Sequence, residues 1–174
     1  MTDRFAHALR LDQIHDGQRL ELVADDGERA AIRERLGLES LAALQAHVVL
    51  SRKSAAIEAS GRILATLEQS CVATGEPIPA HVDEPFTLLF LPEPGSRQAD
   101  EEVELGSTDC DIVFHDGAVI DLGAAIADTL ALSLDPYPRS AGATAVLKEA
   151  GVLSEAEAGP FAALAALKKS GETP

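Results

Sequence analysis

A chain of 174 residues with 46% hydrophobic side chains can bury a core of its own, which excludes a disordered protein. Its 29 acidic and 14 basic residues give a formal net charge of −15, which excludes a protein coated by RNA, because affinity for phosphate depends on Lys and Arg. A local basic patch or a basic protein partner is compatible with this charge.

The N-terminus and the cysteines predict a cytoplasmic protein. Met1–Leu11 has mixed charge and lacks the continuous apolar run of a signal peptide. Gly117–Leu134 is the longest weakly charged stretch, and it is too short and too polar to span a bilayer. Cys71 and Cys110 are the only cysteines, and without a secretory context they are expected to be reduced thiols.

In its first half the chain predicts a strand, a helix and two long strands. Asp25 and Asp26 are favourable N-cap residues, and Gly37 ends a helix that runs through Leu36. In the second long strand apolar and polar residues alternate, which gives one apolar face. Helix is the alternative for this Ala-rich stretch, but a period of two residues fits its length better. The predicted strands are Gln18–Val23, Leu41–Lys53 and Ala55–Cys71.

The second half predicts shorter strands, a long polar loop and further helices. Asp121 is a favourable N-cap for a helix from Leu122 to about Leu132. Pro136 and Pro138 stop this helix. The other expected elements are a turn at Thr74–Pro79, a strand at His81–Leu91, a loop at Pro92–Ser107, a strand at Ile112–His115, a weakly ordered tail from Arg139 and a short helix at Phe161–Lys169.

These elements together predict an α+β fold. We expect a twisted, mainly antiparallel β-sheet or partial barrel, a few short packing helices and a loosely ordered C-terminal tail. The predicted division is a single domain at residues 1–138 and a tail with a short helix at residues 139–174.

Charge divides the chain into a balanced part and an acidic part. Acids and bases nearly cancel up to Arg62, whereas from Ile63 to Pro138 the only Lys or Arg is Arg97. In the balanced part, the candidate RNA contacts are Arg29, Arg33, Arg35, Arg52 and Lys53. Pairing of these side chains with Glu28, Glu34 or the acidic part is the alternative. In the acidic part, the candidate docking residues for a basic partner are Glu93, Asp100, Glu101, Glu102, Glu104, Asp109 and Asp111.

Catalytic motifs are absent from the sequence. There is no glycine-rich phosphate loop, no HExxH and no GxSxG, and the histidines are scattered. Asp109, Asp111 and His115 suggest the alternative of a metal-dependent hydrolase or nuclease. We expect no enzyme activity, no cofactor and no metal, because an acidic loop that enters a strand accounts for the same residues.

Several features follow one another along the chain from Cys71 onward: a cysteine turn followed by Glu-Pro and a strand, an Ile-Asp-Leu helix with a Leu-rich exit to proline, and a C-terminal Pro-Phe-Ala-x-Leu-x-x-Leu. The stretches that carry them are Cys71–Pro77, Pro85–Phe90, Val119–Leu122, Leu130–Pro136 and Pro160–Leu167. This order of features resembles the YceD family of bacterial proteins, and the resemblance covers roughly Leu41 to Lys169.

The resemblance implies a role in accumulation of large-subunit ribosomal RNA and no known enzyme activity. It therefore implies a ribosomal protein or a large-subunit precursor particle as the partner, with ribosomal RNA as a candidate contact; no membrane or DNA partner is expected. Many members carry a second turn cysteine and later cysteines in a pattern that resembles a zinc site. Here Thr74 replaces the second cysteine, and one thiolate does not suffice for structural zinc. An adaptor or oligomerisation protein without an RNA connection is a further alternative.

Overall fold

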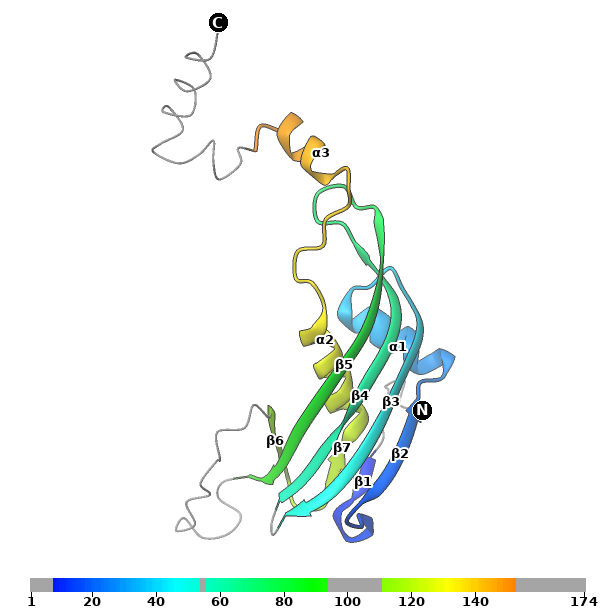
Figure 1. The fold of residues 1–174 in the computed structure, drawn as a ribbon, viewed down its shortest axis with the longest axis vertical. Coiled ribbons are helices and arrows are strands. Elements are labelled where there is room, and N and C mark those ends of the chain that lie inside the picture. The colour runs from blue at the N-terminus through cyan, green and yellow to red at the C-terminus, as the bar shows by residue number, and fades with distance from the viewer. Residues whose placement is uncertain (1–7, 54–55, 94–110, 153–174) are drawn as a thin grey trace, which may run out of the picture. The chain divides into compact units, whose positions relative to one another are not determined.

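The computed structural model describes residues 8–53, 56–93 and 111–152 (Figure 1). Within them the elements are β1 (Ala8–Arg10), η1 (Leu11–Gln13), β2 (Gln18–Val23), α1 (Asp26–Leu36), β3 (Ser40–Lys53), β4 (Ala56–Ser70), β5 (Pro77–Pro92), β6 (Asp111–His115), β7 (Val119–Asp121), α2 (Leu122–Ser133) and α3 (Ala143–Glu149). None of the helices among these residues is long and apolar enough to cross a membrane.

Contacts divide the chain into two units. Unit 1 contains Met1–Gln69 and Pro79–Pro136, and unit 2 contains Ser70–Ile78 and Tyr137–Pro174. Unit 2 therefore takes the turn between β4 and β5 as well as the C-terminal residues.

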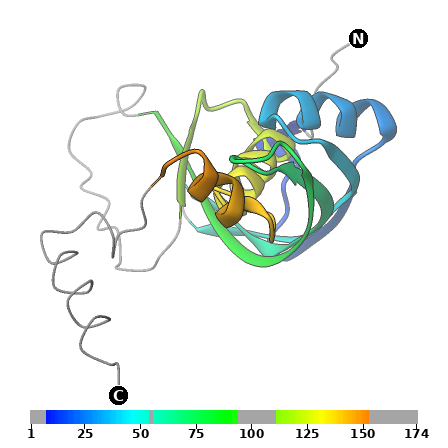
Figure 2. The ribbon, with the colours of Figure 1, turned by 90° about the horizontal axis from the view of Figure 1, so that it is seen from above.

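Unit 1 contains a five-stranded sheet in the order β2-β3-β4-β5-β6 and a two-stranded sheet of β1 and β7. The β2–β3, β3–β4 and β1–β7 pairs are antiparallel, whereas β5 and β6 are parallel, with Leu88 opposite Asp111 and Pro92 opposite His115. The larger sheet curls around α2 without closing (Figure 2). The predicted α+β class and mainly antiparallel sheet are confirmed.

Alternation of apolar side chains positions the long strands. In β4, Ile57, Ala59 and Ile63 are buried, whereas Arg62 is exposed, as the period of two residues predicts. Gly61 lies on the same strand opposite Val48 of β3, and a Cβ there would overlap the backbone carbonyl of His47. The close approach of the two backbones therefore requires glycine at this position.

Helix α2 fills the inner face of the sheet. Leu122, Ile126 and Leu130 are fully buried on it and share one core cluster with residues of the strands. Asp121 caps the helix because its Oδ1 accepts a hydrogen bond of 2.9 Å from the N–H of Ala124. The predicted position and cap of this helix are confirmed.

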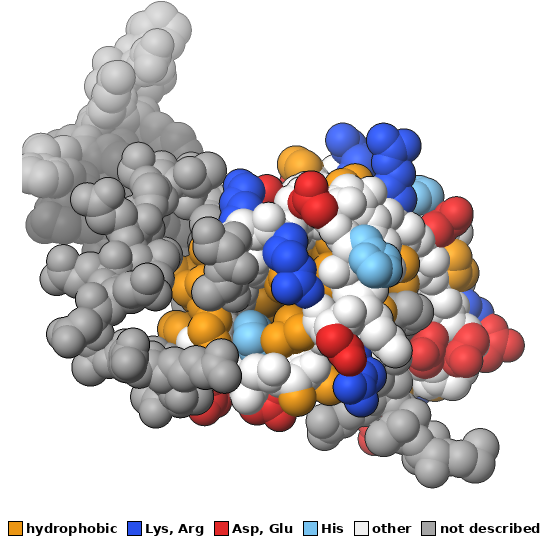
Figure 3. All heavy atoms as spheres, turned by 90° about the horizontal axis from the view of Figure 1, so that it is seen from below, with side chains coloured by type: hydrophobic (Ala, Val, Ile, Leu, Met, Phe, Trp, Pro, Cys, Tyr) orange, Lys and Arg blue, Asp and Glu red, His pale blue; other side chains and the backbone are white. Residues whose placement is uncertain are grey.

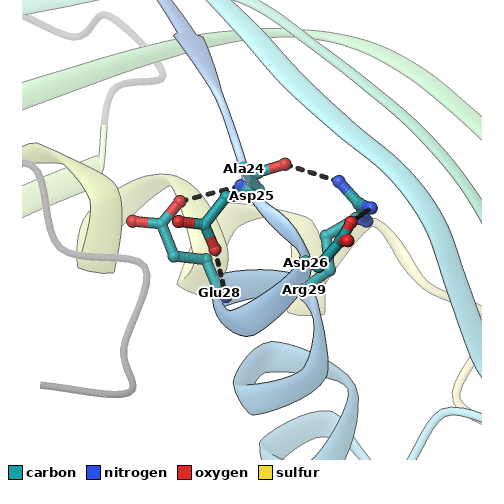
Figure 4. A network of polar contacts seen from close by, with 5 residues as sticks. All are labelled: Ala24, Asp25, Asp26, Glu28 and Arg29. Carbon is teal, nitrogen blue, oxygen red and sulfur yellow. Dashed lines mark hydrogen bonds and ion pairs between the residues drawn. The ribbon is translucent and has the colours of Figure 1, made fainter.

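Helix α1 begins at a reciprocal capping box (Figure 4). Asp25 Oδ1 accepts from the N–H of Glu28 at 2.8 Å, and Glu28 Oε2 accepts from the N–H of Asp25 at 3.0 Å. Gly37 ends the helix in the left-handed region at φ 63°. Both ends therefore lie where the sequence predicts them.

The turn predicted at Thr74–Pro79 lies three residues earlier in the structure, because β4 ends at Ser70 and β5 already begins at Pro77. The N–H of Cys71 donates to the carbonyl of Glu76 at 2.8 Å, and the N–H of Gly75 donates to the carbonyl of Cys71 at 2.9 Å. The chain therefore reverses between Cys71 and Glu76. The sequence does not predict β1, β7 or α3, and α3 lies in the tail that was expected to be weakly ordered from Arg139. The helix predicted at Phe161–Lys169 lies outside the described residues.

Candidate functional site

A groove of about 560 Å³ lies in unit 1 between β6, β7 and α2. Strand β6 supplies one wall, and the three residues of β7 and one side of α2, from Ala124 to Leu132, supply the other. Leu88 and Phe90 of β5 also line the groove. The tight connection between β6 and β7 brings these walls together, because the Asp116 carboxylate accepts from the N–H of Ala118 at 2.9 Å.

The groove exposes large apolar side chains. Phe114 of β6 is 53% exposed and Leu132 of α2 is 77% exposed, although both are apolar. Ile112 and Val119 are also exposed and line the same groove. Figure 3 shows, from below, apolar side chains at the surface between acidic and basic ones. Clustered exposed apolar side chains mark an interaction surface more often than isolated ones do.

His115 is buried in the wall of this groove. It is 7% exposed, and its Nδ1 accepts a hydrogen bond of 3.0 Å from the N–H of Gly117. With Nδ1 as the acceptor, the hydrogen of the neutral ring is on Nε2. Among the described residues, Nε2 is the one buried side-chain polar atom without a hydrogen-bond partner. A buried donor without an acceptor costs free energy, so His115 carries an unsatisfied donor inside this wall.

Four aspartates line the groove: Asp111, Asp116, Asp121 and Asp128. Hydrogen bonds from the N–H groups of Ala118 and then Val119 lower the pKa of Asp116, so this carboxylate stays charged at neutral pH. Asp128 pairs with Arg35 of α1 at 3.1 Å. The groove therefore presents negative charge beside its apolar side chains.

Two of the candidate RNA contacts on α1 are occupied by contacts within the protein. Arg29 donates to the carbonyl of Ala24 at 2.6 Å and pairs with Asp26 (Figure 4). Arg35 pairs with Asp128. Within the described residues no ion pair involves Arg33, which is exposed on the same helix.

The other two candidate RNA contacts lie at the far end of β3. Arg52 donates to the carbonyls of Leu11 and Ile14, and Lys53 pairs with Glu58 of β4. Helix α1 lies beside the upper part of the sheet, whereas β3 ends at the bottom (Figure 1). The structure therefore does not bring the five basic residues together in one patch.

The candidate docking acids lie mostly outside the described residues. Of these acids, Glu93 and Asp111 are described. The others lie outside the described residues: Asp100, Glu101, Glu102, Glu104 and Asp109. Asp111 lines the groove, and the N–H of Glu93 donates to the carbonyl of His115 at 3.1 Å. Asp111 and His115, two members of the hydrolase alternative, therefore share the groove. Among the described residues no group of three His, Cys, Asp or Glu side chains could hold a metal ion.

Cys71 lies in unit 2, in the turn after β4. Its buried Sγ accepts a hydrogen bond of 3.3 Å from the N–H of Ser140. This bond and a further hydrogen bond from the Thr74 side chain lower the pKa of the thiol to about 6. Thr74 therefore stabilises the thiolate form of Cys71.

Sequence reasoning found Asp111 and His115 but missed the apolar part of the groove. The scarcity of aromatic residues predicts Phe114 as a large side chain of the core, but the structure leaves it exposed. The signal for Leu132 is its place at the end of the predicted helix, outside the apolar stripe of Leu122, Ala125, Ile126 and Thr129–Leu130. The position of Leu132 outside the stripe indicates that its side chain is exposed, but it does not indicate which other element lies beside Leu132.

The fold and the groove define a mixed α+β protein with an acidic, partly apolar surface site. A family model described as large ribosomal RNA subunit accumulation protein YceD matches residues 59–168. The chain therefore belongs to the YceD family, as its motifs predict. No curated protein and no solved structure matches the chain.

Proposed function

We propose that this protein is a non-enzymatic factor in the accumulation of the large ribosomal subunit. It acts in the cytoplasm by binding a ribosomal protein or a precursor particle. The observation that carries the proposal is the family match over residues 59–168, with its description as large ribosomal RNA subunit accumulation protein. The family description concerns accumulation and names no reaction.

The charge of the chain supports a protein contact as the main route to the particle. At a net charge of −15 the protein is repelled by ribosomal RNA, except where basic side chains cluster. Arg29, Arg35 and Lys53 already pair with aspartate or glutamate. Ribosomal proteins are basic as a class, so an acidic factor complements them.

The test is sedimentation of a lysate from the protein's own cells, with the protein detected by antibody. We expect it to sediment with precursors of the large subunit and to be absent from small-subunit fractions. Depletion should lower the large-subunit RNA relative to the small-subunit RNA. Absence from every ribosomal fraction, or an equal loss of both RNAs, would contradict the proposal.

A further inference from the structure

We propose that the groove between β6, β7 and α2 binds an extended, basic segment of a protein partner. Apolar side chains of the segment contact Phe114 and Leu132, and its Lys or Arg side chains pair with the aspartates of the groove. This inference rests on the proposed function, for which it names the class of partner and the surface that binds it.

The apolar side chains come from two different elements, a strand and a helix. Phe114 lies on β6 and Leu132 near the end of α2, yet both line one groove. Leaving such side chains in water costs free energy that contact with another apolar surface recovers. A partner that fits here must therefore carry apolar side chains of its own.

The position of β6 favours an extended segment over a helix. β6 is the last strand of its sheet, and within the described residues it pairs with β5 on one side only. The N–H and C=O groups of its other edge are a template for one more strand. Side chains alternate along an added strand, so one face contacts the groove and the other faces solvent.

The charge of the groove selects a basic segment. Asp111, Asp116 and Asp121 surround the apolar side chains, and hydrogen bonds hold the pKa of Asp116 below its usual value. Lys or Arg beside the apolar residues of the segment would pair with these carboxylates. The same carboxylates repel phosphates, so the groove favours a protein over RNA.

The experiment uses the full chain and short fluorescent peptides that tile the large-subunit ribosomal proteins of the same cells. Fluorescence anisotropy should detect binding of peptides in which Lys or Arg alternates with apolar residues. Phe114→Ser and Leu132→Ser should each weaken this binding by about tenfold, as expected for an apolar anchor at the centre of a contact. Val23→Ser is the matched control, because Val23 is 57% exposed on β2 outside the groove, and it should change binding by less than about twofold.

Other outcomes overturn the inference. Equal binding by the parent chain, F114S and L132S would place the contact elsewhere, provided that the melting temperatures agree. A dimer of the parent chain that F114S converts to a monomer would make the groove a contact between copies. Ribosomal RNA fragments that lose affinity in the same variants would assign the groove to RNA.

Sedimentation separates this inference from the proposed function. If F114S and L132S sediment with large-subunit precursors as the parent does, the groove inference fails and the proposed function stands. If the parent is absent from every ribosomal fraction while binding of the peptides still depends on Phe114 and Leu132, the proposed function fails. The groove then remains a binding site for basic segments.

Discussion

Cys71 differs from an ordinary buried thiol because the backbone N–H of Ser140 and the hydroxyl of Thr74 both stabilise its thiolate. The folded-state pKa of about 6 lies below the value of about 8.5 for a free cysteine. Ionisation of Cys71 therefore stabilises the fold fully above about pH 8.5 and progressively less as the pH falls toward about 6. Protonation below that pH removes the contribution.

We expect the ultraviolet absorbance of the thiolate to titrate near pH 6 in a Cys110→Ser background, which leaves Cys71 as the only cysteine. Thr74→Val removes one of the two donors and should move the midpoint toward higher pH. A midpoint near that of free cysteine, about 8.5, in the parent would show that Ser140 does not hold the thiolate. The free energy of unfolding at several pH values gives an independent check, because Cys71→Ala should lose the pH dependence assigned to this group.

Arg33 is the best-placed of the candidate RNA contacts, because Arg29 and Arg35 are engaged within the protein. If α1 contacts ribosomal RNA, Arg33→Gln should reduce the slope of log affinity against log salt by roughly one. Arg29→Gln is the comparison: it should mainly lower the melting temperature, because Arg29 contacts the carbonyl of Ala24 at the start of the helix. An unchanged slope in Arg33→Gln would leave protein contact as the route to the particle.

The pairing of β3 with β4 depends on a glycine, Gly61, at the point where the two backbones approach closely. Gly61→Ala should destabilise unit 1 by about 1–3 kcal/mol, because the new Cβ would overlap the carbonyl of His47 and a backbone cannot rotate away as a side chain can. Ser60→Ala on the same strand is the control and should change the free energy of unfolding much less. Denaturant titration measures both variants. Equal stability of Gly61→Ala and the parent would mean that β3 and β4 separate at little cost.

Local patterns predicted the long strands and both larger helices. Alternation defined β4, and Asp25, Gly37 and Asp121 defined helix ends, because each of these signals acts within a few residues. Helix α3 has no such signal: its N-cap is Gly142, which has no side chain to accept a hydrogen bond. Strands β1 and β7 are three residues each, too short for a period to be visible.

The groove could not be predicted from the sequence, for a different reason. Its walls come from β6, β7 and α2, which are consecutive in the chain but face one another only in the fold. The sequence predicts β6 but neither β7 nor the strand with which β6 pairs. Asp111 and His115 could be identified as polar residues near each other, whereas Phe114 and Leu132 become neighbours only in the fold.

At the scale of the whole molecule, the acidic connection between β5 and β6 is predicted to serve function more than folding. Residues Gly95 to Glu102 lie outside the described residues, and their sequence has no apolar period. Removing them should change stability by less than about 1 kcal/mol, because the entropy of loop closure varies slowly with length. The melting temperature of the deletion variant tests this, and its sedimentation with large-subunit precursors should be weaker than that of the parent. A large fall in melting temperature would show that this segment packs against the fold.

The late position of α2 in the chain has a consequence for synthesis. Leu122, Ile126 and Leu130 fill the inner face of a sheet whose strands β2 to β5 are all translated earlier. Until these residues leave the exit tunnel, the growing chain carries an uncovered apolar sheet face, and such surfaces aggregate or recruit chaperones. Nascent chains arrested after β6 should therefore be protease-sensitive and chaperone-bound, and should become resistant once α2 has emerged.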